Sequence, residues 1–159
     1  MTRPPRTFYL IRQLSAAARV AVDEALSEQD LTAAEYMLLS HLHRQTLVSA
    51  SQMARAFRVS AQAINEQVIG LQDRGLVERK EDADNRRILL LSLTKVGEKT
   101  LEAAEERMDE LEQEFFASIS ANGHSQLRKL VTTLIARSRH ALPPDDRFVA
   151  AKGRRRKVK

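Results

Sequence analysis

The side chains best suited to chemistry lie within residues 60–94, and their chemistry is hydrogen bonding to a partner rather than bond cleavage. Gln62 and Asn65 carry amides that can contact adenine through two atoms of its edge, and Ser60 can bind a phosphate at a helix N-terminus. Arg86 carries a guanidinium that a narrow minor groove attracts through its enhanced negative potential. On their types alone, these residues are ordinary polar groups of a solvated surface. The elements that hold them decide between the two interpretations.

The pattern of residues 49–94 predicts a short helix, a second helix and a β-hairpin. Ser60 is suited to cap the second helix, and Gly75 is suited to end it in a left-handed conformation. The residues that this helix would bury are Ile64, Val68 and Leu71. Beyond it, two apolar segments, LVERK and ILLLSLT, flank the charged loop EDADNRR, as in two strands with a free tip. Two helices this close in sequence are typical of a helix-turn-helix, whose second helix enters the major groove of DNA. This context favours the DNA-contacting interpretation.

Apolar periodicity predicts further helices on both sides of this segment. The first runs over about residues 6–28. Another begins at Thr32, which can form a capping box with Glu35, and the same pattern recurs at Ser49 and Gln52.

Two long helices and a polar tail follow the hairpin. From about Thr94, apolar residues recur at alternating three- and four-residue spacing, as on a helix packed along another helix. A last helix spans about residues 121–141. Residues 142–159 have no apolar period and are expected to be a basic, disordered tail.

Composition and charge restrict the class of protein. The 159 residues are 43% hydrophobic and 4% aromatic, which suits a mainly α-helical protein, and the lack of cysteine excludes disulfides, thiolate metal sites and thiol redox switches. No run approaches the ~18 apolar residues of a membrane helix, and no signal-peptide core is present, so a cytoplasmic protein without a membrane partner is expected. The net charge of the chain is +5, and residues 152–159 alone carry six positive charges. Residues 1–151 therefore have a net charge of about −1. DNA binding would therefore depend on a local patch or on the tail.

Two segments resemble the MarR family of bacterial transcription regulators: LTAAEYMLLSHL, and SASQMARAFRVSAQAINEQVIGLQDRGLVERKEDADNRRILLLSLTKVG. The most specific parts are VS at the recognition-helix start, LxxxGLVER across residues 71–79, and a wing pattern with Asp82, Arg86 and Arg87 that ends in LxLT. In order and spacing the resemblance covers roughly residues 6–141.

The resemblance implies both a fold and an assembly. The fold is mainly α with a small β-hairpin wing (α+β): a winged helix-turn-helix in residues 31–95, flanked by dimerisation helices in residues 1–30 and 96–141. The implied homodimer interlocks its first and last helices, and the unpaired apolar stripes of those helices indicate the same partner. Two recognition helices would then lie on a pseudo-palindromic operator in double-stranded DNA, with half-sites about 34 Å apart.

The residues expected to contact DNA come from the helix-turn-helix and the wing: Ser49, Ser60, Gln62, Ala63, Asn65, Glu66, Arg86 and Arg87. Two positions depart from the family. Glu66 replaces a frequent Arg, so it would repel phosphate but could accept from a cytosine amino group, and Asn85 replaces a frequent Asp. Arg87 could instead pair with Asp82 or Asp84 and hold the loop, because an alternating strand would turn adjacent arginines to different sides.

The family further implies an effector pocket between the dimerisation helices and the winged domain, often for small aromatic or amphipathic anions. Arg12, Arg19, Tyr36 and His43 could face such a space, with the arginines balancing a carboxylate or phenolate. Salt bridges and core packing are the favoured alternative for these four residues, because one sequence does not determine which side chains line a pocket.

Catalytic and metal-binding patterns are not recognisable in the sequence. His41 and His43 are two residues apart on a helix and so lie on different faces, and the acidic run of residues 102–112 is typical of a solvated helix face. No Ser/His/Asp order, phosphate-binding glycine loop or HExxH occurs. We therefore expect no enzyme activity, no cofactor and no metal.

Together these features predict a homodimeric, sequence-specific DNA-binding transcriptional regulator, a repressor released by a small effector. The alternative is a winged-helix module for protein contacts, or for nonspecific chromosome binding through the tail KGRRRKVK by counterion release. That tail could equally be a solvated end.

Overall fold

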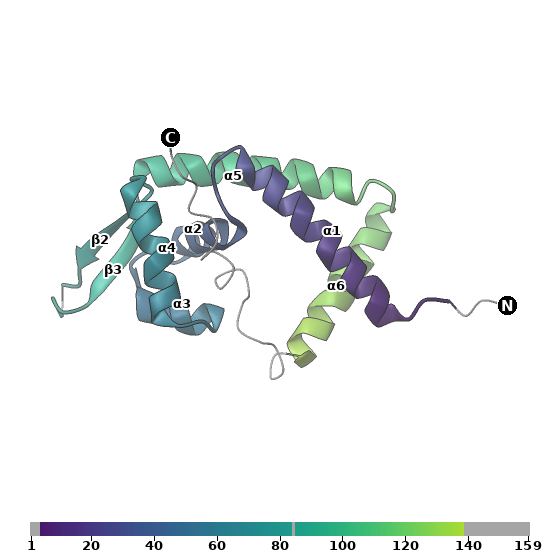
Figure 1. Ribbon diagram of the computed structural model, residues 1–159, viewed down its shortest axis with the longest axis horizontal. Coiled ribbons are helices and arrows are strands. Elements are labelled where there is room, and N and C mark those ends of the chain that lie inside the picture. Colours follow the sequence, from purple (N-terminus) through teal and green to yellow (C-terminus); the bar gives the residue numbers. More distant parts are fainter. Residues whose placement is uncertain (1–3, 84, 139–159) are drawn as a thin grey trace.

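The computed structural model describes residues 4–83 and 85–138, which form six helices and a three-stranded sheet (Figure 1). In chain order the elements are α1 (Thr7–Ser27), α2 (Ala33–Arg44), β1 (Val48–Ser49), α3 (Ala50–Phe57), α4 (Ala61–Asp73), β2 (Val77–Glu81), β3 (Leu89–Leu93), α5 (Lys95–Phe115) and α6 (Ala121–Ser138). The helices α2, α3 and α4 and the sheet gather near the start of the long α5, and α6 follows its other end (Figure 1). This mainly helical fold with a small sheet confirms the predicted class.

Reciprocal side-chain caps determine where α2 and α3 begin. Thr32 Oγ1 accepts from the Glu35 amide at 3.2 Å, and the Glu35 carboxylate accepts from the Thr32 amide at 2.8 Å. Ser49 and Gln52 repeat the arrangement, with the same two distances. Each box satisfies amides that a helix N-terminus otherwise leaves without partners, so both predicted helix starts are confirmed.

The wing is the antiparallel hairpin of β2 and β3, which confirms the predicted hairpin. Val77 lies opposite Leu93, and Glu81 lies opposite Leu89. The third strand, β1, has no counterpart among the sequence-based expectations. It pairs Val48 with Leu91, which gives the strand order β1-β3-β2. Two residues are too few to show an alternating pattern, and the second of them also caps α3.

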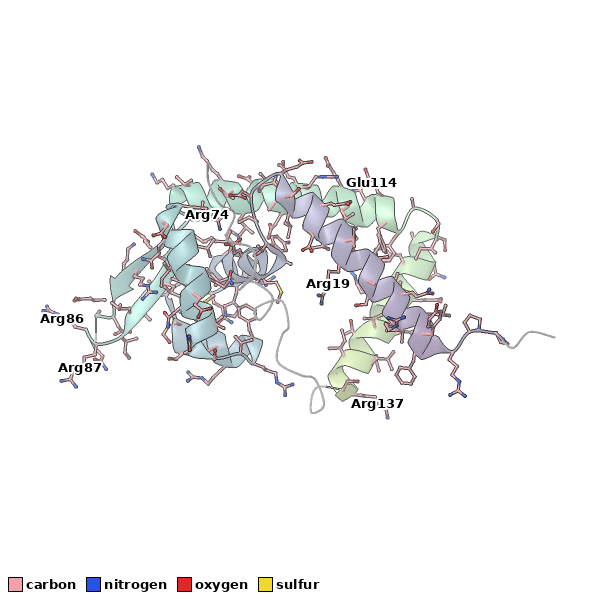
Figure 2. All side chains as sticks on the ribbon, in the orientation of Figure 1. Arg19, Arg74, Arg86, Arg87, Glu114 and Arg137 are labelled. Atoms are coloured by element: carbon pink, nitrogen blue, oxygen red, sulfur yellow. The ribbon has the colours of Figure 1, made fainter. Side chains whose placement is uncertain are left out.

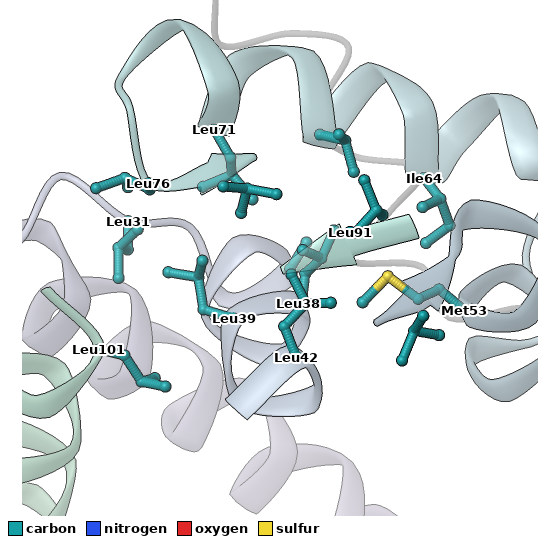
Figure 3. Packing of buried hydrophobic residues seen from close by; sticks show 14 of the residues in the cluster. Leu31, Leu38, Leu39, Leu42, Met53, Ile64, Leu71, Leu76, Leu91 and Leu101 are labelled. Carbon is teal, nitrogen blue, oxygen red and sulfur yellow. The ribbon is translucent and has the colours of Figure 1, made fainter. Parts of the chain in front are cut away.

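One apolar core joins α2, α3, α4, β3 and the first half of α5 (Figure 3). Its fully buried side chains include Leu38, Leu39 and Leu42 of α2, Met53 of α3, Ile64, Val68 and Leu71 of α4, Leu91 of β3 and Leu101 of α5. The predicted buried face of α4 is thereby confirmed. Burying each such side chain contributes roughly 1.5–3 kcal/mol. The core therefore holds α4 as part of a rigid winged domain.

The end of α4 is held closely against the start of α5. Gly75 has a φ of 69°, which confirms the predicted left-handed glycine at the end of this helix. Thr94 Oγ1 donates to the Gly75 carbonyl at 2.6 Å and accepts from the Gly97 amide at 3.0 Å. A Cβ added at Gly97 would lie well inside 3.0 Å of the Leu76 carbonyl oxygen. Only glycine allows the two backbones to approach this closely.

The outer helices bury little of their apolar surface. No residue of α6 is buried, and in α1 only Ala25 and Leu26 are. The exposed apolar residues include Phe8, Leu10, Ile11, Leu14 and Val20 of α1, and Leu130, Val131, Leu134 and Ile135 of α6. The expected helical residues 139–141 and the tail 142–159 lie outside the described residues. Among those described, no helix combines the length and apolarity needed to cross a membrane.

Candidate nucleic-acid interface

The first turn of α4 is exposed to solvent and is capped by a side chain. Ser60 is exposed, and its Oγ accepts from the Ala63 amide at 3.1 Å, which confirms Ser60 as the N-cap. The hydroxyl keeps its own proton, which it can donate to a phosphate, and the helix dipole favours an anion at this end. Ala63 is half-buried beside it. The cap therefore orients the two residues around a turn that a nucleic-acid backbone can approach.

Gln62 and Glu66 form a pair on the exposed face of α4. Gln62 Nε2 donates to Glu66 Oε1 at 3.1 Å, and both side chains are exposed. With the amide nitrogen directed at Glu66, the pair keeps the Gln62 carbonyl oxygen and the second carboxylate oxygen as acceptors. Acceptors in the major groove suit the amino groups of cytosine and adenine. The departure at Glu66 thus changes the hydrogen-bonding character of Gln62 as well as its own position.

Asn65 lies on the same helix but is already engaged within the protein. Its Nδ2 donates to the Ala61 carbonyl at 3.0 Å, and its Oδ1 accepts from Arg79 Nη2 at 3.1 Å. Arg79 Nε is buried and finds no hydrogen-bond partner among the described residues. A base contact by Asn65 would have to use its second amide N–H and its second carbonyl lone pair, or break these bonds. Arg79 lies in the LVERK segment, but nothing in that segment alone indicates a contact with α4.

The wing tip is a closed turn that carries two exposed arginines. Asp82 Oδ1 accepts from the Asn85 amide at 3.0 Å, and Asn85 Oδ1 accepts from the Arg87 amide at 3.1 Å. Arg86 and Arg87 extend from the outer end of the wing (Figure 2). They lie in the turn between β2 and β3, within the predicted charged loop, so strand alternation does not determine their directions. Asn85 thus contributes to this turn through its side chain.

Ser49 is half-buried and is already bonded within the winged domain. It pairs with Leu90 in the sheet, and its hydroxyl and amide both belong to the capping box of α3. Its position is at the start of the first helix of the helix-turn-helix, where α3 and α4 pack against each other.

The four effector candidates lie on α1 and α2 and differ in burial. Arg12, Arg19 and His43 are exposed, and the Arg12 guanidinium lies 5.8 Å from the centre of the Tyr9 ring on its own helix. Figure 2 shows Arg19 extending from α1 on the side of the winged domain. Tyr36 is half-buried against the core, and burial raises the pKa of its phenol, with the α5 carboxylates adding to the effect.

A groove of about 480 Å³ lies elsewhere, at the turn between α5 and α6. None of the four effector candidates lines it. Its walls include Glu112, which accepts from Arg128 at 2.7 Å and lies 3.3 Å from His124 Nε2, and Phe116, which stacks on His124 at 4.4 Å. These contacts hold α6 at an angle to α5.

Comparison with known proteins agrees with this geometry. The model of the MarR family matches residues 29–88. The uncharacterized HTH-type transcriptional regulator YdcH of Bacillus subtilis is 30% identical over 115 residues, which cover 69% of this chain and 78% of the relative. The HTH-type transcriptional repressor Rv2887 of Mycobacterium tuberculosis is 28% identical over 126 residues, which cover 79% and 91% of the two chains.

A solved structure shares the fold. A mutant of E. coli MarR, crystallised in complex with operator DNA, superposes with a TM-score of 0.72 over 80% of this chain and 91% of its own, at 23% identity. The helix-turn-helix, the wing and the long flanking helices are thus common to both proteins. From the family match, the relatives and the fold together, the chain belongs to the MarR family of transcriptional regulators.

Proposed function

We propose that a homodimer of this chain binds a pseudo-palindromic DNA operator and represses transcription until a small effector changes the dimer geometry. One observation supports the proposed binding of DNA. The capped first turns of α4 present Ser60, Gln62 and Glu66 on a rigidly packed helix, beside a wing whose tip carries Arg86 and Arg87. A helix of this kind suits the major groove, and an arginine on a narrow wing suits the minor groove.

The exposed apolar faces of α1 and α6 support the dimer. A monomer would leave Leu14 of α1 and Leu134 of α6 about half exposed, at 45% and 54%, within larger apolar stretches. Contiguous apolar surface of this kind usually marks a protein interface. A two-fold symmetric dimer presents two copies of α4, and two symmetric helices require a palindromic site.

Repression and its relief form the regulatory part of the proposal. Rv2887, whose chain this one matches over most of its length, is named a repressor. An effector relieves repression only if it binds one dimer geometry more tightly than the other. Arg19, which extends from α1 on the side of the winged domain, and Tyr36 and His43 of α2 remain candidates for such a contact.

Selection from a random library tests the DNA-binding part. The purified full-length protein is used to select duplexes from a randomised pool, and the selected duplex then competes with random DNA at physiological salt. We expect a palindrome that binds at least ~1,000-fold more tightly than random DNA. Equal affinity for both would overturn the regulator proposal and support nonspecific chromosome binding instead.

Removal of Arg86 tests the contribution of the wing. Arg86→Ala should weaken operator binding by roughly 10-fold, about 1.4 kcal/mol, because the minor-groove contact is lost. Lys99→Ala is the control, since Lys99 is an exposed cation of α5, outside both the wing and the exposed apolar stripe of α6. If the two variants bind equally well, the wing arginine has no role in binding.

A further inference from the structure

Arg74, the residue that caps the C-terminus of α4, joins three separate segments of the chain. Its Nε donates to the Gly70 carbonyl of its own helix at 3.3 Å, which orients the side chain. Its Nη2 then donates to Glu35 Oε1 at 2.6 Å, and its Nη1 donates to the Asp30 carbonyl at 2.5 Å. The side chain is 29% exposed, so these bonds are partly shielded from water. A guanidinium is suited to this role because its donors form a rigid fork.

The two distant acceptors define the corner between α1 and α2. Asp30 follows α1 with a φ of 53°, a left-handed conformation that is uncommon for residues other than glycine but that Asp tolerates better than most. Glu35 uses its other oxygen, Oε2, for the capping box that begins α2. Arg74 thus stabilises the corner from outside, at both its turn and its cap.

The same end of α4 is held by α5 on another side. The bond from Thr94 Oγ1 to the Gly75 carbonyl and the close approach of Gly97 to Leu76 join α4 to the start of α5. The helices α1 and α5 are the two that connect the winged domain to the exposed apolar faces. The junction at Arg74 and Gly75 is therefore where the recognition helix meets both connections to the outer helices (Figure 2).

We propose that Arg74 is a positioning residue that sets the separation of the two recognition helices in the dimer, and with it the half-site spacing that the dimer accepts. This inference rests on the proposed function, because spacing has meaning only for a dimer on a palindrome. Helix α4 has 13 residues and is about 20 Å long. A rotation of the winged domain by about 10° at the Arg74 corner moves the far end of α4 by about 3.4 Å, the rise of one base pair.

The test measures spacing preference rather than affinity alone. The probes are the palindrome selected by the full-length wild-type protein, and the same duplex with one base pair inserted or deleted at its centre. The wild type should prefer the selected spacing by ~10-fold or more, and Arg74→Ala should bind the three duplexes within about 3-fold of one another. A residue that only stabilised the fold would lower binding to all three duplexes in proportion.

The matched control is Arg107→Ala. Arg107 also has a side chain that is 29% exposed and pairs with carboxylates, but its partners are Glu28 and Glu110, so it joins α1 to α5 without contacting α4. Its variant should keep the wild-type spacing preference.

A second variant covers the case in which Arg74→Ala does not fold. Glu35→Gln retains an acceptor for the capping box but removes the charge that Arg74 binds, so it should relax the spacing preference in the same direction. If the wild type discriminates between spacings and both variants discriminate equally well, the role of Arg74 is overturned while the proposed function stands. If the wild type selects no palindrome, the proposed function fails and this inference fails with it.

Discussion

The winged domain buries its apolar side chains within one chain, whereas the outer helices leave most of theirs exposed. In the winged domain, α2, α3, α4 and β3 bury their apolar side chains against one another, and Leu38, Leu39 and Ile64 are fully buried. In α6 every described residue is half-buried or exposed, although its sequence is as regularly apolar as that of α2. The winged domain is therefore stabilised by packing within one chain, whereas the apolar face of α6 is left for the partner in the proposed dimer.

Truncation of a buried leucine of the core should change the free energy of unfolding more than any other substitution considered below. Leu39→Ala should lower the free energy of unfolding by about 2–5 kcal/mol, because it removes a fully buried side chain and leaves a cavity. Leu47→Ala is the control, since this leucine is 50% exposed and its loss should change stability by less than about 0.5 kcal/mol. Urea denaturation measures both. Equal effects would mean that the winged domain has no closed core.

The second effect concerns the open face of α6. Leu134→Asp places a charge within the exposed apolar stripe and should raise the dimer dissociation constant by ~100-fold or more, with little change in helix content. Ala136→Asp is the control, because two residues further along a helix lie on nearly the opposite face. Light scattering coupled to size-exclusion chromatography, over a series of concentrations, measures the association. Unchanged association of the Leu134 variant would place the interface elsewhere.

The third effect concerns the junction between the two regions. Gly97→Ala should destabilise the protein by about 1–3 kcal/mol, because its Cβ meets the Leu76 backbone. The same substitution at Gly70 should stabilise the protein by roughly 0.5–1 kcal/mol, because Gly70 is inside α4 and has nothing within 4 Å of its added Cβ. Thermal unfolding should therefore shift in opposite directions for the two variants. A shared direction would mean that close approach at Gly97 is not what requires glycine.

The smallest effect is a titration inside the winged domain. His41 of α2 packs edge-on against Phe57 of α3 at 5.2 Å, and burial lowers the pKa of His41, with nearby Arg44 adding to the shift. Because the folded pKa lies below the unfolded value, stability is unaffected above about pH 6.5 and is lost as the pH falls toward the folded pKa. NMR titration should give a value below 6.5, and His41→Gln should reduce the loss of stability in acid. A folded pKa at or above 6.5 would contradict this packing.

Much of the winged domain was predictable because its determinants are local. Thr32 with Glu35, and Ser49 with Gln52, fix helix starts within four residues of sequence, and Gly75 ends α4 through its own backbone conformation. The wing follows from two apolar segments around a charged loop. The outer helices were also predictable as helices, since periodicity alone reveals an amphipathic stripe.

The remaining features depend on contacts between residues far apart in sequence. Arg74 contacts residues 39 and 44 positions away, and Arg79 contacts Asn65 14 positions away. Nothing in either segment indicates these partners, so the sequence alone does not predict that the amide of Asn65, a candidate base contact, also bonds within the protein. Arg86 and Arg87 lie in the turn between β2 and β3, as the charged loop predicts, but the hydrogen bonds that close this turn are not evident from charge alone.

The most direct test of the dimer is the mass of the 159-residue chain in solution. Sedimentation equilibrium should give twice the 18.0 kDa mass of one chain at micromolar concentration, and two chains for each selected operator duplex. That result would show that the apolar faces left open on α1 and α6 are covered by a second copy. A mass of 18.0 kDa over the whole concentration range without DNA, together with one chain for each bound duplex, would contradict the proposed dimer.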